Sequence, residues 1–353
     1  MTGPGHPWVP RSVEDADEAA ALAAVRGGDE AAFAELVERY RRPLPVHCYR
    51  MLGSFDDAED MVQETLLRAW RARASFEGRS SFRTWLYRIA TNACLNVLER
   101  TPRRVMPPQV APPAHDSQPT AAWAPEIPWL QPIPDDLLEL AGPRETEPDA
   151  VVTSKETVEL VYLAALQHLP PRQRAVLILR DALGWPAKDA AELLDMSLAS
   201  LNSALQRARS TMRSQLPTGR LDWGPAVSSS EEERALLHRF MYAFEQADVG
   251  ALSTMLREDA LQTMPPALLW FEGRPAIVAH LAFLLGPESP GDFRLVPSGA
   301  NRQPAYAAYL RPRGDSAFRL SGLNVLRVEG GRIAEITSFR PDLCRGFDLP
   351  DTL

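Results

Sequence analysis

Apolar residues recur at steps of three and four along three stretches of the chain, 17–52, 56–104 and 153–217. In the second stretch this spacing marks one inner helical face from Met61 to Trp70 and another from Phe82 to Val97. Helices with one apolar face need a core to bury it, so these stretches are predicted to form all-α domains. We expect one helical domain over 17–104 and a second over 153–217.

The pattern changes from Glu231 onward. Helical spacing gives helices near 236–244, 249–257 and 275–285, and short apolar runs alternate between them and beyond. Strands are predicted at 260–264, 268–271, 293–296, 305–310, 318–328 and 332–339. The turn residues 329–331 join the last two strands in a hairpin. Residues 231–347 are therefore predicted to be an α+β domain, a curved antiparallel sheet with helices over one face.

Two linkers separate these domains, at 105–152 and at 218–230. The first holds eleven prolines between 105 and 148, and eight acidic residues against one arginine. Proline removes backbone donors and like charges repel, so an extended acidic strand is expected. One apolar segment stands out in it, carrying Trp129, Leu130 and Ile133, and we expect it to dock in a groove of the C-terminal domain. The alternative is a local collapse without a fixed partner.

Composition narrows the class of protein. The 353 residues carry a net charge of −8, and Cys48, Cys94 and Cys344 are odd in number and far apart. The sequence lacks a Cys/His cluster, so no metal, disulfide framework or cofactor is expected. His47 is predicted to be a core or rim histidine rather than a ligand. With neither a signal pattern nor a long apolar run, we expect a soluble cytoplasmic protein without a membrane partner.

The sign of the charge reverses locally. From 65 to 104 there are nine arginines against two glutamates, a net charge of about +7, which points to nucleic acid. The loop from Phe76 to Ser81 suits a flipped base, because it offers a ring and short polar groups. Ahead of this basic stretch, Asp57, Asp60 and Glu64 share one helical face that a positively charged partner could bind.

The stretch 186–213 predicts a helix-turn-helix. A short helix, a turn at residues 195–197 and a second helix follow one another, and Asp195 stands where glycine is common. Leu198, Leu201, Leu205, Ala208 and Met212 are predicted to face inward. The predicted DNA-facing residues are Ser200, Asn202, Ser203, Gln206, Arg207 and Arg209. Amides can read adenine edges, and arginine can read guanine or hold phosphate.

Two blocks carry a resemblance to a known family. DDAEDMVQETLLRAW and FRTWLYRIATNACLNVLER resemble region 2 of the extracytoplasmic-function sigma factors of RNA polymerase, and LPPRQRAVLILRDALGWPAKDAAELLDMSLASLNSALQRAR resembles their region 4. The resemblance implies that Asp57, Asp60, Gln63 and Glu64 bind polymerase and that region 4 reads the minus-thirty-five element. For the minus-ten element it implies contacts from Phe76, Arg79, Ser81, Arg83, Thr84, Arg88, Asn92, Asn96 and Arg100.

The C-terminal domain resembles the SnoaL-like members of the cone fold, chiefly through DALQTMPPALLWFEGRPAIVAHL. That superfamily includes isomerases and cyclases whose carboxylate and histidine do acid–base work. Candidates here are Asp259, Glu272 and His280, although rim or structural roles fit the last two better. Met264, Leu269, Trp270 and Phe271 are predicted to line an apolar pocket that could hold a small ligand.

These features together predict a sigma factor that is not an enzyme. Its partners would be RNA polymerase core and promoter DNA, and its C-terminal domain would control it. An acidic chain should bind DNA weakly unless polymerase holds it in place. Two alternatives remain open: a one-component helix-turn-helix regulator that senses a small ligand, and a cyclase or isomerase fused to a DNA-binding segment.

Overall fold

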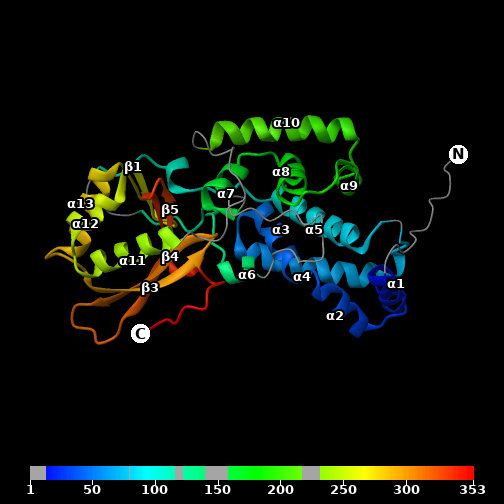
Figure 1. The fold of residues 1–353 in the computed structure, drawn as a ribbon, viewed down its shortest axis with the longest axis horizontal. Helices are drawn as coiled ribbons and strands as arrows, with labels where there is room; N and C mark the ends of the chain where they lie inside the picture. The colour runs from blue at the N-terminus through cyan, green and yellow to red at the C-terminus, as the bar shows by residue number, and fades with distance from the viewer. Residues whose placement is uncertain (1–12, 79, 116–121, 140–157, 217–230) are drawn as a thin grey trace. The chain divides into compact units, whose positions relative to one another are not determined.

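The computed structural model describes residues 13–78, 80–115, 122–139, 158–216 and 231–353. The chain forms two compact units (Figure 1). The first comprises residues 1–102, 139–153 and 165–221, and the second comprises residues 103–138, 154–164 and 222–353. The first is helical and the second combines helices with a sheet, which confirms the predicted fold class.

Five helices form the N-terminal part of the first unit. They are α1 (Val13–Arg26), α2 (Glu30–Glu38), α3 (Pro43–Leu52), α4 (Phe55–Ala72) and α5 (Phe82–Leu98), with a 3-10 turn η1 at Arg73–Ser75. Side-chain oxygens of Asp29, Ser54 and Ser81 cap α2, α4 and α5 by accepting backbone N–H groups of the first turn. Gly53 ends α3 in the left-handed conformation at φ 68°.

The core of these helices is closed around α3 and α5. Tyr49, Cys48, Leu86 and Cys94 are all fully buried. His47 lies among them, 2.9 Å from the Thr91 hydroxyl, and burial followed by the charge of Arg50 lowers its pKa to about 3. The prediction of a core histidine is confirmed.

The C-terminal part of the first unit contains the helix-turn-helix. Its helices are α8 (Pro171–Leu177), the π-helical turn η4 (Ile178–Ala182), α9 (Ala187–Leu193) and α10 (Leu198–Gln215). Ser197 caps α10, and Asp195 adopts the left-handed φ of 52° that the frequent glycine would favour. Leu201, Leu205, Ala208 and Met212 are buried as predicted. The prediction for Leu198 is wrong, because its side chain is 50% exposed at the start of the helix.

The second unit is built on a six-stranded sheet in the order β2-β1-β6-β5-β4-β3. The strands are β1 (Leu256–Thr263), β2 (Trp270–Glu272), β3 (Gly291–Ala300), β4 (Gln303–Pro312), β5 (Arg319–Glu329) and β6 (Arg332–Phe339). The β5–β6 hairpin is confirmed, with Glu329 paired to Arg332 across two glycines of positive φ. The prediction of a purely antiparallel sheet is wrong, because β1 pairs with β6 in parallel.

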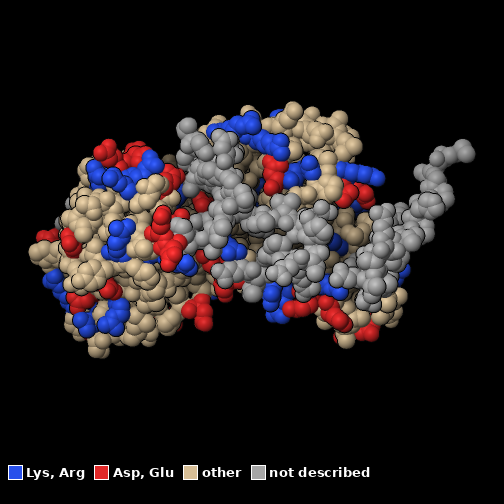
Figure 2. All heavy atoms as spheres, in the orientation of Figure 1, with Lys and Arg blue, Asp and Glu red and all other residues tan. Residues whose placement is uncertain are grey.

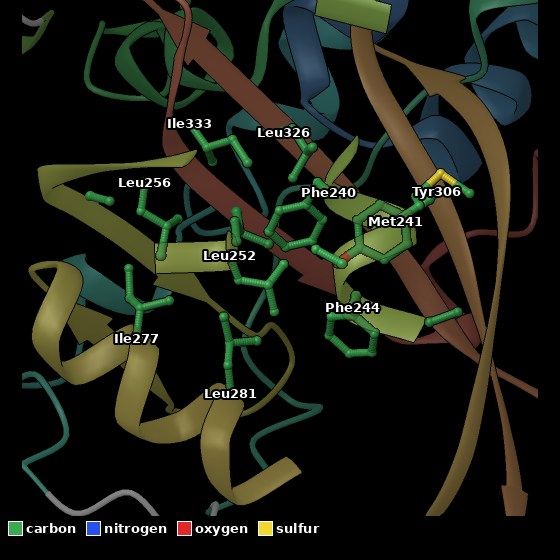
Figure 3. Close-up of a cluster of buried hydrophobic side chains, with 14 of the residues drawn as sticks. Phe240, Met241, Phe244, Leu252, Leu256, Ile277, Leu281, Tyr306, Leu326 and Ile333 are labelled. Atoms are coloured by element: carbon green, nitrogen blue, oxygen red, sulfur yellow. The ribbon is translucent and has the colours of Figure 1, made fainter. Parts of the chain in front are cut away.

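Helices α11 (Glu231–Glu245), α12 (Val249–Met255) and α13 (Arg274–Leu285) accompany the sheet. They close a core in which Phe240, Phe244, Leu252 and Ile277 meet strand residues such as Leu326 (Figure 3). Each such side chain stabilises the fold by roughly 1.5–3 kcal/mol when fully buried. The domain therefore has an apolar core of its own.

The described residues of the first linker belong to the second unit as far as Leu138. This linker contains a 3-10 turn η2 (Pro107–Gln109) and a one-turn helix α6 (Asp135–Glu139), and α7 (Leu160–Leu166) begins in this unit. The linker also bonds to the outer edge of β2, where the Ala114 N–H donates to the Trp270 carbonyl at 2.8 Å. At the opposite edge, the Leu295 N–H of β3 donates to the Glu245 carboxylate at 2.8 Å. Both outer strands thus have a partner for an edge group.

Candidate polymerase and nucleic-acid interfaces

The acidic face of α4 is open to solvent. Asp60 and Gln63 are exposed, while Asp57 and Glu64 are half-buried, and Glu64 forms a 2.6 Å ion pair with Arg68 in the next turn. Sequence analysis missed one residue of this face. Leu67 is 43% exposed and follows Gln63 and Glu64 by four and three positions, so it adds an apolar side chain to the carboxylates. In the sequence, the only signal is that Leu67 is apolar yet falls outside the spacing of the inner face of this helix.

The loop before α5 does not present the predicted stacking ring. Phe76 is only 6% exposed and packs on Trp85 at 4.9 Å between ring centroids and on Phe82 at 6.1 Å. Ser81 and Thr84 bond to each other at 3.0 Å within the helix cap. The expectation of an exposed Phe76 is therefore wrong, because the apolar start of α5 binds its ring. Arg79 lies outside the described residues.

The outer face of α5 carries the other predicted minus-ten residues. Asn92, Asn96 and Arg100 are exposed. Arg88 instead donates to the Glu192 carbonyl at 3.1 Å, and its guanidinium lies 3.6 Å from the Glu192 carboxylate. Arg83 lies over the Trp185 ring at 5.2 Å. Part of this basic face therefore contacts the helix-turn-helix.

A polar cleft of about 670 Å³ lies at this contact. It is lined by Ser80, Arg88, Asn92, Arg172, Glu192, Leu193, Leu194 and Asp195. Its walls therefore come from the α5 side and from the α9 side of the same unit. The cleft brings two of the predicted minus-ten residues beside the turn that precedes α10.

A buried arginine reinforces this contact. Arg174 of α8 is 2% exposed and donates to the carbonyl of Met51 at 2.6 Å and to the Gln167 side chain at 2.9 Å. It also donates to the carbonyls of Gln167 at 3.2 Å and Leu169 at 3.3 Å. Burial lowers its pKa to about 10, so the guanidinium stays charged at neutral pH. Carbonyl oxygens near the end of α3 and before α8 are thereby held by one cation.

The recognition helix α10 presents most of its predicted DNA-facing side chains. Asn202, Ser203, Gln206 and Arg207 are exposed, whereas Arg209 forms two bonds of 2.8 and 2.7 Å with the carboxylate of Asp181. Ser200 shares its hydroxyl with Ser197 at 3.0 Å. Lys and Arg gather over the C-terminal half of α10 on the face shown in Figure 2. The helix therefore combines amide groups near its start with positive charge farther along.

The apolar linker segment lies against the C-terminal domain. Trp129, Leu130 and Ile133 are 2%, 0% and 1% exposed. Ile133 bonds in both directions to Asn301, through its N–H to the side-chain oxygen at 3.1 Å and through its carbonyl to the N–H at 3.0 Å. Asp135 begins α6 and accepts the Arg302 N–H at 2.6 Å. These bonds join the linker to the β3–β4 turn.

The acid–base candidates of the C-terminal domain differ in their exposure to solvent. Asp259 is exposed and paired with Arg257 at 2.7 Å, a bond that lowers the pKa of its carboxyl, and Glu272 is also exposed. His280 is 6% exposed and stacks on Phe271 at 4.5 Å. Asp259 is thus held by an arginine, and His280 packs on an aromatic ring.

The predicted pocket residues also divide. Leu269 and Phe271 are buried in the core, with Met264 packed against it. The Trp270 indole instead donates to the Ala111 carbonyl of the linker at 2.9 Å. Adjacent strand residues point to opposite faces, which explains the division at 270 and 271. The expectation of a shared lining is therefore wrong for Trp270.

Over the described residues, no group of three or more His, Cys, Asp or Glu side chains could hold a metal ion. The three cysteines are free thiols buried in their units. No helix in the described part of the chain combines the length and the apolar character needed to cross a membrane.

Three family models match this chain in order. They are Sigma-70 region 2 over residues 36–104, Sigma-70 region 4 over residues 159–212 and the SnoaL-like domain over residues 237–336. The chain is 43% identical over 331 residues to the ECF RNA polymerase sigma factor SigG of Mycobacterium tuberculosis, covering 93% of this chain and 86% of that protein.

Two further relatives match to different extents. ECF RNA polymerase sigma factor SigW of Bacillus subtilis is 29% identical over 54% of this chain and 92% of its own length. The crystal structure of the Mycobacterium tuberculosis extracytoplasmic function sigma factor SigJ aligns with a TM-score of 0.57 at 21% identity. That alignment covers 90% of this chain and 99% of SigJ, and it shows a shared fold.

Proposed function

Because this chain belongs to the extracytoplasmic-function sigma factors of RNA polymerase, we propose how its surfaces divide the work of transcription initiation. The acidic face of α4 binds polymerase core, the outer face of α5 reads the minus-ten strand, and α10 reads the minus-thirty-five element. The C-terminal domain modulates the activity of the two helical domains. This work takes place in the cytoplasm, where promoter DNA and polymerase meet.

The observation that carries this division is the opposite charge of two neighbouring helices. Asp57, Asp60 and Glu64 lie on the outside of α4, whereas Arg83, Arg88 and Arg100 belong to the outside of α5 and its end. Carboxylates repel phosphate, so the α4 face is suited to a basic protein surface and the α5 face to nucleic acid. Leu67 supplies the apolar contact that an interface centred on carboxylates otherwise lacks.

Promoter binding requires the α5 face to be released. Arg88 is bonded to Glu192, and Arg83 lies over Trp185, so both exchange these contacts for DNA when the promoter binds. The −8 charge of the chain also weakens its attraction to phosphate. Polymerase supplies the missing positive surface and holds the two reading helices at their separate elements.

The C-terminal domain acts on the other domains through the linker. Its β3–β4 turn holds Ile133 and Asp135, and its β2 edge holds Ala114. Fixing the linker shortens the free chain between the minus-ten and minus-thirty-five readers, which limits how far they separate. Family membership favours this account over a one-component regulator.

A charge-reversal pair of variants tests the polymerase contact. Asp60→Lys with Glu64→Lys should abolish capture of the chain by immobilised polymerase core and abolish run-off transcription. The matched control reverses Glu35 and Glu38 on α2. There Glu38 pairs with Arg41 as Glu64 pairs with Arg68, and this control should bind normally. Equal capture of both double variants would refute the assignment of the α4 face.

A further inference from the structure

The first turn of the recognition helix exposes a large apolar side chain. Leu198 begins α10 and is 50% exposed, whereas Leu201, Leu205 and Met212 on the same helix are at most 6% exposed. Ala199 and Ser200 beside it are exposed as well. Single exposed leucines are common on protein surfaces, so the exposure alone decides nothing. Its position in the motif is what gives it meaning.

In a helix-turn-helix, the residues at the start of the second helix reach the base edges. Here that start is fixed. The Ser197 hydroxyl accepts the Ser200 N–H at 3.2 Å and donates to the Ser200 hydroxyl at 3.0 Å. The two hydroxyls that flank Leu198 are thus bonded to each other. Leu198 therefore stands at the leading end of the helix as an apolar group in a defined backbone position.

The major groove offers one apolar group to such a side chain. Base edges there present hydrogen-bond donors and acceptors, and thymine adds its C5 methyl group. No acidic residue occurs between Leu198 and Gln215, while Arg207 and Arg213 are exposed farther along the helix. The charge of α10 thus suits a DNA duplex.

We propose that Leu198 reads the methyl group of a thymine in the minus-thirty-five element. This assignment rests on the proposed function, since it requires α10 to enter the major groove. Asn202, Ser203 and Gln206 then lie farther along the helix and contact neighbouring bases by hydrogen bonds. Leu198 adds discrimination for thymine over cytosine, which lacks the methyl group.

The test removes only the methyl group. Holoenzyme reconstituted from polymerase core and the full chain is bound to a promoter found by run-off transcription, and each thymine of the minus-thirty-five duplex is replaced singly by deoxyuridine. At one position the wild-type holoenzyme should bind about fourfold more weakly, the value of one buried methyl-sized group. Leu198→Ala should bind the thymine promoter more weakly by a similar factor and lose the thymine–deoxyuridine difference. Leu198→Met should retain it.

The control is another exposed apolar residue, Tyr242 of α11, which is 69% exposed in the C-terminal domain. Tyr242→Ala should discriminate as the wild type does. The proposal would be overturned if Leu198→Ala kept the full thymine–deoxyuridine difference in binding at every position. It would also be overturned if no replacement weakened binding of the wild-type holoenzyme. If Leu198→Ala weakened binding to the thymine promoter and to every deoxyuridine promoter by the same factor, Leu198 would be assigned to a polymerase contact. That result would also overturn the proposal. Failure of the wild-type chain to form a holoenzyme would instead refute the proposed function itself.

Discussion

The imidazole of His47 is neutral in the folded protein, and its pKa rises to the ordinary value when the chain unfolds. Burial among α3 and α5 lowers its pKa to about 3, against an ordinary value near 6.5. Below pH 6.5 the unfolded chain binds a proton that the folded chain does not. The stability that His47 contributes is therefore present above about pH 6.5 and is lost as the pH falls toward 3.

We expect the free energy of unfolding of the helical unit to fall by about 2 kcal/mol more in the wild type than in His47→Gln between pH 7 and pH 5. Urea titrations measure this free energy at each pH, with hydrogen exchange of the α3 amides as the probe of unfolding. The glutamine variant keeps the carboxylate contributions and removes only the imidazole. Parallel pH dependence of the two proteins would contradict the buried, neutral state.

Cysteine reactivity is the second residue-scale prediction. Cys94 is fully buried, and its hydrogen bond with Cys48 together with burial raises its pKa. Only the thiolate reacts readily with a disulfide reagent, so Cys94 should not react in the native protein at pH 8. Cys48 should not react either, because its side chain is fully buried and the reagent cannot reach it. Labelling with dithionitrobenzoate before and after denaturation measures this. Fast native labelling of Cys94 would show that the α3–α5 packing opens readily.

At this scale the sequence predicts burial better than exposure. The sequence predicts a core position for His47 because the residue lies within an apolar helical pattern. The predictions for Leu198 and Phe76 fail because periodicity does not reveal where a helix loses its packing partner or where the ring of a loop residue packs back on a helix. Leu198 precedes the buried face of α10 by one turn, and Phe76 is drawn in by Phe82 and Trp85.

Among the elements, the linker is fixed by a few apolar side chains. Replacing Trp129 and Leu130 by serine should remove the protection of the β3–β4 turn amides, because each side chain is fully buried and its loss costs roughly 2–5 kcal/mol. Hydrogen exchange of Asn301 and Arg302 measures this. Trp123→Ser is the matched control, since that tryptophan of the same linker is 56% exposed. Unchanged exchange in the double variant would sink the docking role.

The contact between α5 and α9 makes a separate prediction. Glu192→Ala removes the 3.6 Å ion pair with Arg88 and keeps only the backbone carbonyl as its acceptor. Arg88 should therefore be held less tightly, and initiation at limiting polymerase should rise by up to about fivefold, the range expected of a surface ion pair. Run-off transcription at several polymerase concentrations measures the gain. Asp189→Ala removes another carboxylate of the same helix and should leave initiation unchanged. A gain of equal size in both would show a general charge effect.

Local signals predicted most elements but not all of their partners. Cap residues such as Ser81 and Ser197 mark helix starts directly in the sequence, and two glycines mark the β5–β6 hairpin. The parallel pairing of β1 with β6 joins strands about seventy residues apart, for which no local pattern exists. The Arg174 bond to Met51 joins residues 123 positions apart, and no local pattern indicates it either.

For the whole molecule, the C-terminal domain and the linker act together. Ending the chain after Leu216 removes the C-terminal domain, against which Trp129, Leu130 and Ile133 pack. The truncated chain therefore loses the regulatory domain and also exposes these apolar side chains. We expect such a truncation to alter run-off transcription from the same promoters. A truncated chain that also carries serine at these three positions separates the loss of control from apolar exposure. Equal activity of all three proteins would refute a regulatory role.

The covered edge of β2 has a consequence for the opened molecule. If the linker were displaced from the Trp270 carbonyl, the edge of β2 would be exposed to water and could pair with the same strand of another copy. The association of such exposed edges would depend on the concentration of the protein. At low concentration the linker of such a molecule would bind β2 again before another copy arrives. At high concentration the molecules would aggregate, so the lifetime of the state with an exposed edge should shorten as expression rises.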